Sequence, residues 1–223
     1  VGVEFATRLL KTGMVVTVNG ATGEVFKGGI GDWKMEDRKW KIEEKKTYNK
    51  TKTKLYVNLS EPEQALEVSR MDVDGVGLLR AEFMIASFGI HPKKLIDEGK
   101  KKVFVEMLSE KMATFCQAFY PRPVVYRSSD FKSNEYRDMT GGEKYEKPEE
   151  NPMLGFRGCY RYIKDPEIFE LEISAIKRVR NALGYRNLWL MLPFARTPEE
   201  LFKVKEIINA HGLKRSGSFK LWL

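Results

Sequence analysis

The chain contains few of the residues that most often hold metals or form covalent links. It has two histidines, His91 and His211, and two cysteines, Cys116 and Cys159. The cysteines lie far apart and follow neither a CxxC nor a zinc-ligand spacing, so the sequence indicates no disulfide framework and no zinc site. We expect both to be buried free thiols. We expect structural or surface roles for both histidines.

Long hydrophobic runs are also missing. No stretch approaches the roughly 18 apolar residues that indicate a membrane helix, and the N-terminal VGVEFATRLLKTG lacks the pattern of a signal peptide. We therefore expect a cytoplasmic protein without a membrane partner. With 42% hydrophobic residues in 223, the chain can build one sizeable core, or one domain with a smaller attachment.

Positive charge is in excess, and half of the excess lies in one stretch. The net charge is +8, and residues 31–54 alone carry nine Lys or Arg against five Asp or Glu. Polar runs of mixed sign are typical of solvated linkers, so we predict a linker over residues 31–53. Contact with a polyanion is the alternative, but the signs are too mixed to favour a nucleic-acid partner.

Two valine-rich segments near the N-terminus, 15–18 and 25–26, flank the turn sequence NGATG and predict a small β-hairpin. A lone hairpin is marginally stable in water and needs a partner sheet. We therefore interpret residues 1–30 as the end of a different domain.

From residue 54 onward, short apolar runs alternate with amphipathic segments. Strands are predicted at 54–59, 75–79, 123–126, 188–192 and 219–223, and helices at 60–69, at 101–119, from 165 and from 197. Ser60 and Thr197 each begin an N-terminal capping signature with proline in the first turn. This alternation predicts a parallel sheet covered by helices, which is satisfied by a doubly wound α/β sheet or by a (β/α)₈ barrel.

The residues directly after the predicted strands favour the barrel. No glycine-rich phosphate loop comes after the first strand, as a dinucleotide-binding sheet would require, and charged residues stand directly after the second and third. Since a complete barrel needs about 250 residues, residues 54–223 predict a partial (β/α)₈ TIM-type barrel of about five strands.

Three arginines come after apolar segments: Arg80, Arg127 and Arg157. The guanidinium group is permanently charged and presents a planar fork of donors that matches carboxylate and phosphate oxygens. Parallel strands end at the same edge of a sheet, so we expect these side chains to converge there on a small anion. The alternative is that each forms only a strand-end ion pair, Arg80 with Glu82 or Arg127 with Asp130.

Four segments, in this order, carry a family resemblance: VDGVGLLRAEFMI, YPRPVVYRSSDFKSNEYR, GGEKYEKPEENPMLGFRG and LWLMLPFARTPEEL. Together they resemble the phosphoenolpyruvate-utilising enzymes, and among these the phosphoenolpyruvate synthases (pyruvate, water dikinases). The hairpin VVTVNGATGEVFKG is similar to the end of that family's swivelling phosphohistidine domain. The resemblance therefore implies the end of that domain at 1–30, the linker at 31–53 and the first part of the pyruvate-binding barrel at 54–223.

The resemblance also implies a reaction. ATP would phosphorylate a histidine on the mobile domain, and the barrel would pass the phosphoryl group to pyruvate, giving phosphoenolpyruvate, AMP and phosphate. Arg80 and Arg127 match two family arginines that would hold the phosphoryl group and the enolate or carboxylate. Arg157 matches the arginine of the family's LGWR motif, here with Phe156 in place of tryptophan. Neighbouring acids would orient these arginines.

Other parts of the family's machinery match no position of this chain. These are the ATP-binding domain, the phosphohistidine, the magnesium-binding acids and the proton-donating cysteine, so no catalytic or metal-binding residue is assigned here. We expect the whole enzyme to use Mg²⁺ and ATP and to form a homo-oligomer. We expect no turnover by this chain alone. A non-catalytic assembly or regulatory homologue is the alternative, although retention of all three arginines favours an enzyme.

Overall fold

The chain divides into two compact units, Val1–Asn49 and Lys50–Leu223. The computed structural model describes residues 6–18, 24–28 and 52–223, and each unit is described by itself. The predicted linker and the NGATG turn lie almost wholly outside the described residues, so they stay predictions. In the first unit, helix α1 (Ala6–Leu9) precedes an antiparallel pair of strands, β1 (Val16–Val18) and β2 (Val25–Lys27), and this pair confirms the predicted hairpin.

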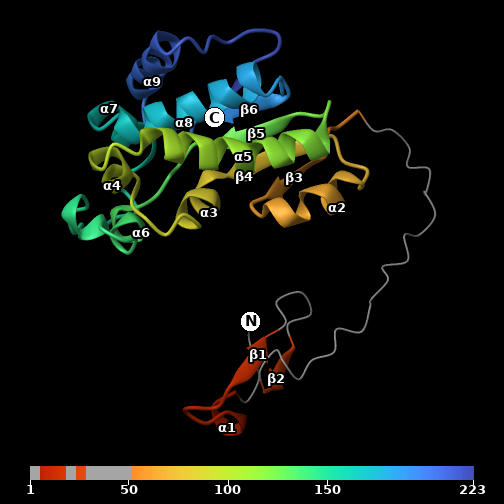
Figure 1. Cartoon of the computed structure of the whole chain (residues 1–223), viewed down its shortest axis with the longest axis vertical. Coiled ribbons are helices and arrows are strands. Elements are labelled where there is room, and N and C mark those ends of the chain that lie inside the picture. Colours follow the sequence, from red (N-terminus) through yellow and green to blue (C-terminus); the bar gives the residue numbers. More distant parts are fainter. Residues whose placement is uncertain (1–5, 19–23, 29–51) are drawn as a thin grey trace. The chain divides into compact units, whose positions relative to one another are not determined.

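The second unit is built on a five-stranded parallel sheet (Figure 1). Its strands follow the order of the chain: β3 (Tyr56–Leu59), β4 (Gly75–Arg80), β5 (Val124–Arg127), β6 (Leu188–Met191) and β7 (Leu221–Trp222). A doubly wound sheet reverses its strand order at the point where ligands bind, whereas a barrel does not. The sequential order therefore separates the two folds that the sequence left open.

The sheet curls until its first and last strands approach each other. Tyr56 on β3 lies edge-on to Trp222 on β7 with ring centroids 5.6 Å apart, and Trp189 on β6 lies 6.1 Å from Trp222. Gly77 leaves room for this packing, because a Cβ there would come within 2.7 Å of the Tyr56 Cβ. The predicted partial TIM-type barrel is thus confirmed, with aromatic rings on its inner side.

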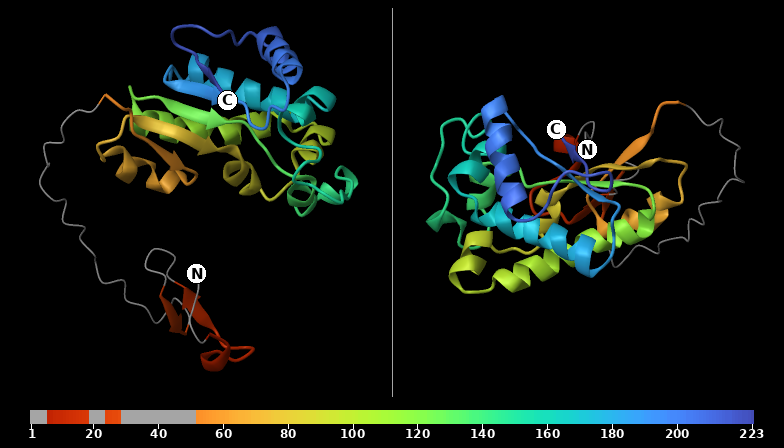
Figure 2. Two further views of the ribbon diagram at one scale, coloured as in Figure 1. Left: turned by 180° about the vertical axis from the view of Figure 1, so that it is seen from behind. Right: turned by 90° about the horizontal axis from the view of Figure 1, so that it is seen from above.

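Helices pack against the sheet and against one another to form the core. Helix α5 buries Phe104, Leu108, Met112, Phe115 and Phe119 along one face, at the spacing of three to four residues that an amphipathic helix requires. It contacts α2 and α8, and α7 contacts α9 (Figures 1 and 2). These helices are α2 (Ala65–Ser69), α5 (Lys101–Phe119), α7 (Gly158–Lys164), α8 (Glu167–Lys177) and α9 (Pro198–Ala210).

The predicted helix caps are confirmed in one case and not in the other. The Thr197 hydroxyl accepts a hydrogen bond from the Glu200 N–H at 3.2 Å, as expected. Ser60 is not a helix N-cap, because a 3₁₀ turn at Pro62–Gln64 precedes α2 and the N-cap of this turn is Glu61. Helix α8 continues into a π-helical turn, Arg178–Ala182, and the apolar Leu183 that comes after this wider turn is 41% exposed.

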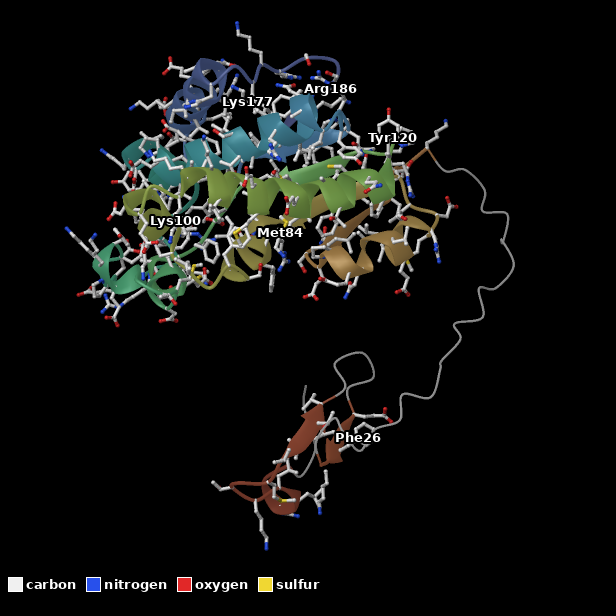
Figure 3. All side chains as sticks on the ribbon, viewed as in Figure 1. Phe26, Met84, Lys100, Tyr120, Lys177 and Arg186 are labelled. Carbon is white, nitrogen blue, oxygen red and sulfur yellow. The ribbon has the colours of Figure 1, made fainter. Side chains whose placement is uncertain are left out.

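Short helices gather at the end of the barrel where the strands finish. Lys100 and Tyr120 mark the two ends of α5 in Figure 3, and these helices lie toward the Lys100 end. They are α3 (Ala81–Ala86), α4 (Pro92–Asp97), α6 (Ser133–Arg137) and the 3₁₀ turn Gly142–Lys144. Across the described parts of the chain, no helix has the length and apolarity to cross a membrane.

Candidate functional site

An open cavity of about 540 Å³ lies where β4 and β5 end. Arg80 is the last residue of β4, Arg127 is the last residue of β5, and the two are partners in the sheet register. Arg157 reaches the cavity from the N-cap of α7. The expectation that the three arginines converge at the carboxyl ends of the strands is confirmed, while their role in binding a ligand stays a prediction.

Close packing between α7 and the segment after β6 positions Arg157 at the cavity. Gly158 has a φ of +56°, and a Cβ there would lie 2.6 Å from the Phe194 Cβ and 2.8 Å from the Pro193 carbonyl oxygen. The Cys159 N–H and thiol both donate to that carbonyl, each at 3.3 Å. The Phe194 ring in turn lies 4.5 Å from the Arg157 guanidinium carbon. Backbone packing therefore sets the place of this arginine.

Two carboxylates hold two of the arginines, in pairs that differ from those considered above. Glu82 Oε1 accepts from Arg127 Nη2 at 2.9 Å and from the Asp130 N–H at 2.8 Å. Asp130 instead binds Arg157, accepting from Nε at 2.9 Å and from Nη2 at 2.5 Å. These bonds and the charge of Asp130 raise the pKa of Arg157 above its ordinary value. The pairs Arg80 with Glu82 and Arg127 with Asp130 are thus wrong. Arg80 and Glu82, two apart at the start of α3, point in different directions, and the carboxylate of Asp130 is taken by Arg157.

The remaining hydrogen-bonding capacity is uneven. The Arg80 side chain is exposed and forms no hydrogen bond or ion pair with any residue in the described ranges. Arg127 Nε and Glu82 Oε2 are buried without a partner within those same ranges. Buried polar atoms are nearly always paired, so an unpaired donor and acceptor in one cavity wall call for an explanation. A bound ligand that reorganises this wall would supply one.

The cavity as a whole is not strongly positive. Its charged lining residues are Arg80, Arg127, Lys132 and Arg157 together with Glu82, Asp130, Glu135 and Asp138. Since the two signs balance in number, attraction for an anion depends on directed donors, above all those of Arg80, rather than on an excess of charge.

Other polar residues of this end are structural. The His91 Nδ1 accepts from the Lys93 N–H at 3.1 Å, so the proton lies on Nε2, which faces Glu146 Oε1 at 3.2 Å. Arg161 binds both oxygens of Glu146, at 2.6 and 2.9 Å. This buried cluster confirms a structural role for His91, and on α9 the His211 Nδ1–H donates to the Ile207 carbonyl at 2.9 Å.

Both cysteines are buried free thiols, as expected. Burial raises the pKa of Cys159 to about 12 and that of Cys116 further above its ordinary value, so neither is a thiolate near neutral pH. No group of three or more His, Cys, Asp or Glu side chains able to hold a metal ion occurs in residues 6–18, 24–28 and 52–223.

Glu172 was not found from the sequence. It occupies a position on α8 where the apolar pattern surrounds it on both sides, and it is fully buried behind β5. Its carboxylate accepts hydrogen bonds from Tyr126 and Ser129, next to the cavity residues Arg127 and Asp130. A glutamate among core residues of an amphipathic helix is the one signal that could have indicated it.

Comparison with known proteins identifies relatives. The family model of the PEP-utilising enzyme, PEP-binding domain, matches residues 34–220. The chain is 44% identical to a probable phosphoenolpyruvate synthase of Staphylothermus marinus and 43% identical to a phosphoenolpyruvate synthase of Aeropyrum pernix, in both cases over 100% of its own length. It is 39% identical to a phosphoenolpyruvate synthase of Pseudomonas aeruginosa over 96% of its length. The chain spans only 28%, 29% and 30% of these three relatives.

Proposed function

The chain belongs to the family of PEP-utilising enzymes through its PEP-binding domain, and from this premise we propose that its cavity binds phosphoenolpyruvate and pyruvate through Arg80, Arg127 and Arg157. The observation that carries the proposal is that these three arginines line one cavity at the carboxyl ends of β4 and β5. Enolate and phosphoryl oxygens both gain charge during phosphoryl transfer, and cations that are held in place stabilise that charge without reorganising. Carboxylates hold Arg127 and Arg157 in this way.

The three arginines divide this work according to their free donors. Arg80 has its whole guanidinium fork available to the ligand, and Arg127 keeps Nε beside the Nη2 that Glu82 holds. Arg157 already gives two donors to Asp130 and a third to the Met153 carbonyl. We therefore assign most of the direct anion binding to Arg80 and Arg127. Arg157 contributes a fixed positive charge to the lining of the cavity.

The whole protein is proposed to be a phosphoenolpyruvate synthase. In it, ATP phosphorylates a histidine on a swivelling domain that ends within residues 1–30, a linker over 31–53 comes next, and the barrel that starts at 54 transfers the group to pyruvate. Homo-oligomeric assembly and a requirement for Mg²⁺ belong to the same proposal. The described residues contain no cluster of metal ligands, so no step through magnesium is derived for this chain.

The test is calorimetric titration of the 223-residue chain with phosphoenolpyruvate. Replacing Arg80 by methionine removes charged hydrogen bonds, which contribute about 1.5–3 kcal/mol each, and should weaken binding by about tenfold or more. Arg157→Met should weaken it less. Arg70→Met is the matched control, because it removes one exposed arginine outside the cavity. Equal affinity of wild type and Arg80→Met would contradict the proposed site.

Turnover is a separate matter. The chain carries anion-binding arginines, but neither a covalent phosphoryl carrier nor the bridging metal site has been assigned to it, and arginines cannot replace them. We expect no phosphoenolpyruvate or AMP from ATP, pyruvate and Mg²⁺ with this chain alone. Turnover near the rate of an intact relative would contradict this assignment.

A further inference from the structure

Glu172 is a fully buried carboxylate that the proposed binding site does not use directly. It accepts three hydrogen bonds, from the Tyr126 hydroxyl at 2.6 Å, the Ser129 N–H at 3.0 Å and the Ser129 hydroxyl at 2.5 Å. No basic side chain forms an ion pair with it in the described part of the chain. Because a buried charge is costly unless it is paired or hydrogen-bonded, such a residue needs a reason to be there.

The hydrogen bonds of Glu172 hold the short turn directly after β5. The same turn is held by the Tyr162 hydroxyl, which donates to the Ser129 carbonyl at 2.5 Å and lies 3.0 Å from the Ser128 hydroxyl. The Tyr136 hydroxyl lies 3.4 Å from the Ser129 hydroxyl. Side chains of helices α6, α7 and α8 therefore all contact these two serines from inside the protein.

Both neighbours of this serine pair are charged residues of the cavity. Arg127 precedes it, and Asp130 comes after it and binds Arg157 through both of its oxygens. A displacement of Ser129 would move all three cavity residues at once. We propose that Glu172 is a positioning residue: its ionised carboxylate fixes the Ser129 turn and so holds Arg127 and Asp130 in the arrangement that binds the anionic ligand. This inference rests on the proposed function.

Protonation of Glu172 would disturb this arrangement for a simple reason. The carboxyl proton must be donated to Tyr126 or to the Ser129 hydroxyl, yet each of these groups now donates its own proton to Glu172. One hydroxyl must then turn away, and the turn loses a hydrogen bond. A glutamine at position 172 has the same difficulty at every pH, because its amide nitrogen is a donor only.

The charge state of Glu172 changes near neutral pH. Burial raises its pKa from the ordinary 4.5 to about 7, against the lowering effect of its hydrogen bonds from Ser129 and Tyr126, and the nearby Glu82 raises it further. The ionisable groups that face it from β5, α6 and α7 are Tyr126, Tyr136 and Tyr162. Burial raises the pKa of each tyrosine far above its ordinary value. Within this group, Glu172 is therefore the one that titrates between pH 5 and 9.

The experiment compares phosphoenolpyruvate affinity in wild type and Glu172→Gln between pH 5.5 and 8.5. The ratio of the two dissociation constants at each pH cancels the titration of the ligand itself. We expect Glu172→Gln to bind about tenfold more weakly at pH 8.5, as expected for one lost hydrogen bond to a charged group. The ratio should fall toward one at pH 5.5, where the wild-type carboxyl is itself protonated. Glu167→Gln, an exposed change on the same helix, should leave the ratio at one throughout.

The outcomes separate the two proposals. A ratio that is raised equally at every pH indicates a purely structural role and overturns the positioning proposal, as does a ratio of one at every pH. In both cases binding by wild type still supports the proposed function. If wild type does not bind phosphoenolpyruvate at any pH, the proposed function fails and the positioning role fails with it.

Discussion

Replacing Gly158 by alanine should destabilise the protein and displace Arg157 from the cavity. The residue has a φ of +56°, a conformation that costs an L-residue with a side chain about 1–2 kcal/mol. The new methyl group would also lie 2.6 Å from the Phe194 Cβ and 2.8 Å from the Pro193 carbonyl oxygen. Neither atom can yield easily, since one sits on a residue with a φ of +52° and the other accepts two hydrogen bonds from Cys159. Overpacking of this kind adds about 1–3 kcal/mol.

The expected loss of unfolding free energy for Gly158→Ala is therefore about 2–5 kcal/mol, measured by urea denaturation. Gly99→Ala is the matched control, because Gly99 has a similar φ of +71° but no atom within 4 Å of its Cβ position. It should lose only the backbone contribution of about 1–2 kcal/mol. Where Gly158→Ala remains folded, phosphoenolpyruvate should also bind more weakly, because Arg157 precedes the displaced residue. Equal losses of stability in the two variants would refute the close-packing argument.

Two further predictions concern the surroundings of the cavity. Phe194→Leu removes the aromatic face that lies against Arg157, an interaction of about 0.5–2 kcal/mol, and should weaken phosphoenolpyruvate binding about threefold. In an Arg157→Met background the same change should have no further effect on binding. A loss of the same size in both backgrounds would show that the ring does not act through Arg157. Glu172 should make wild type less stable to urea as the pH rises from about 4.5 to 7, because the folded protein keeps a proton that the unfolded chain releases. The full effect is at most about 3 kcal/mol and should be missing from Glu172→Gln, so parallel stability curves for the two proteins would contradict the raised pKa.

The partners of the cavity arginines could not be read from the chain. Sequence neighbours suggested Glu82 for Arg80 and Asp130 for Arg127, but Glu82 binds Arg127 and Asp130 binds Arg157. An ion pair depends on where two side chains meet in space, and strands that are adjacent in the sheet bring together residues that are 45 positions apart in the chain. The spacing of residues along the chain therefore does not predict which side chains form an ion pair.

By itself, the sequence determined the features that arise from local pattern. The alternation of apolar strands and amphipathic helices predicted a parallel barrel-like sheet, and the positions of Arg80 and Arg127 directly after two successive strands predicted that they would meet, because parallel strands end at one edge. Only the tertiary structure decided how Arg157, which does not directly follow a strand, reaches the cavity. It alone also showed which hydrogen bonds allow Glu172 to be buried on the apolar face of α8. Both depend on packing between elements far apart in the chain: Gly158 against Phe194, and the carboxylate against the turn at 128–129. Burial and hydrogen-bond partners are properties of the assembled fold, so no local pattern of residue types could have specified them.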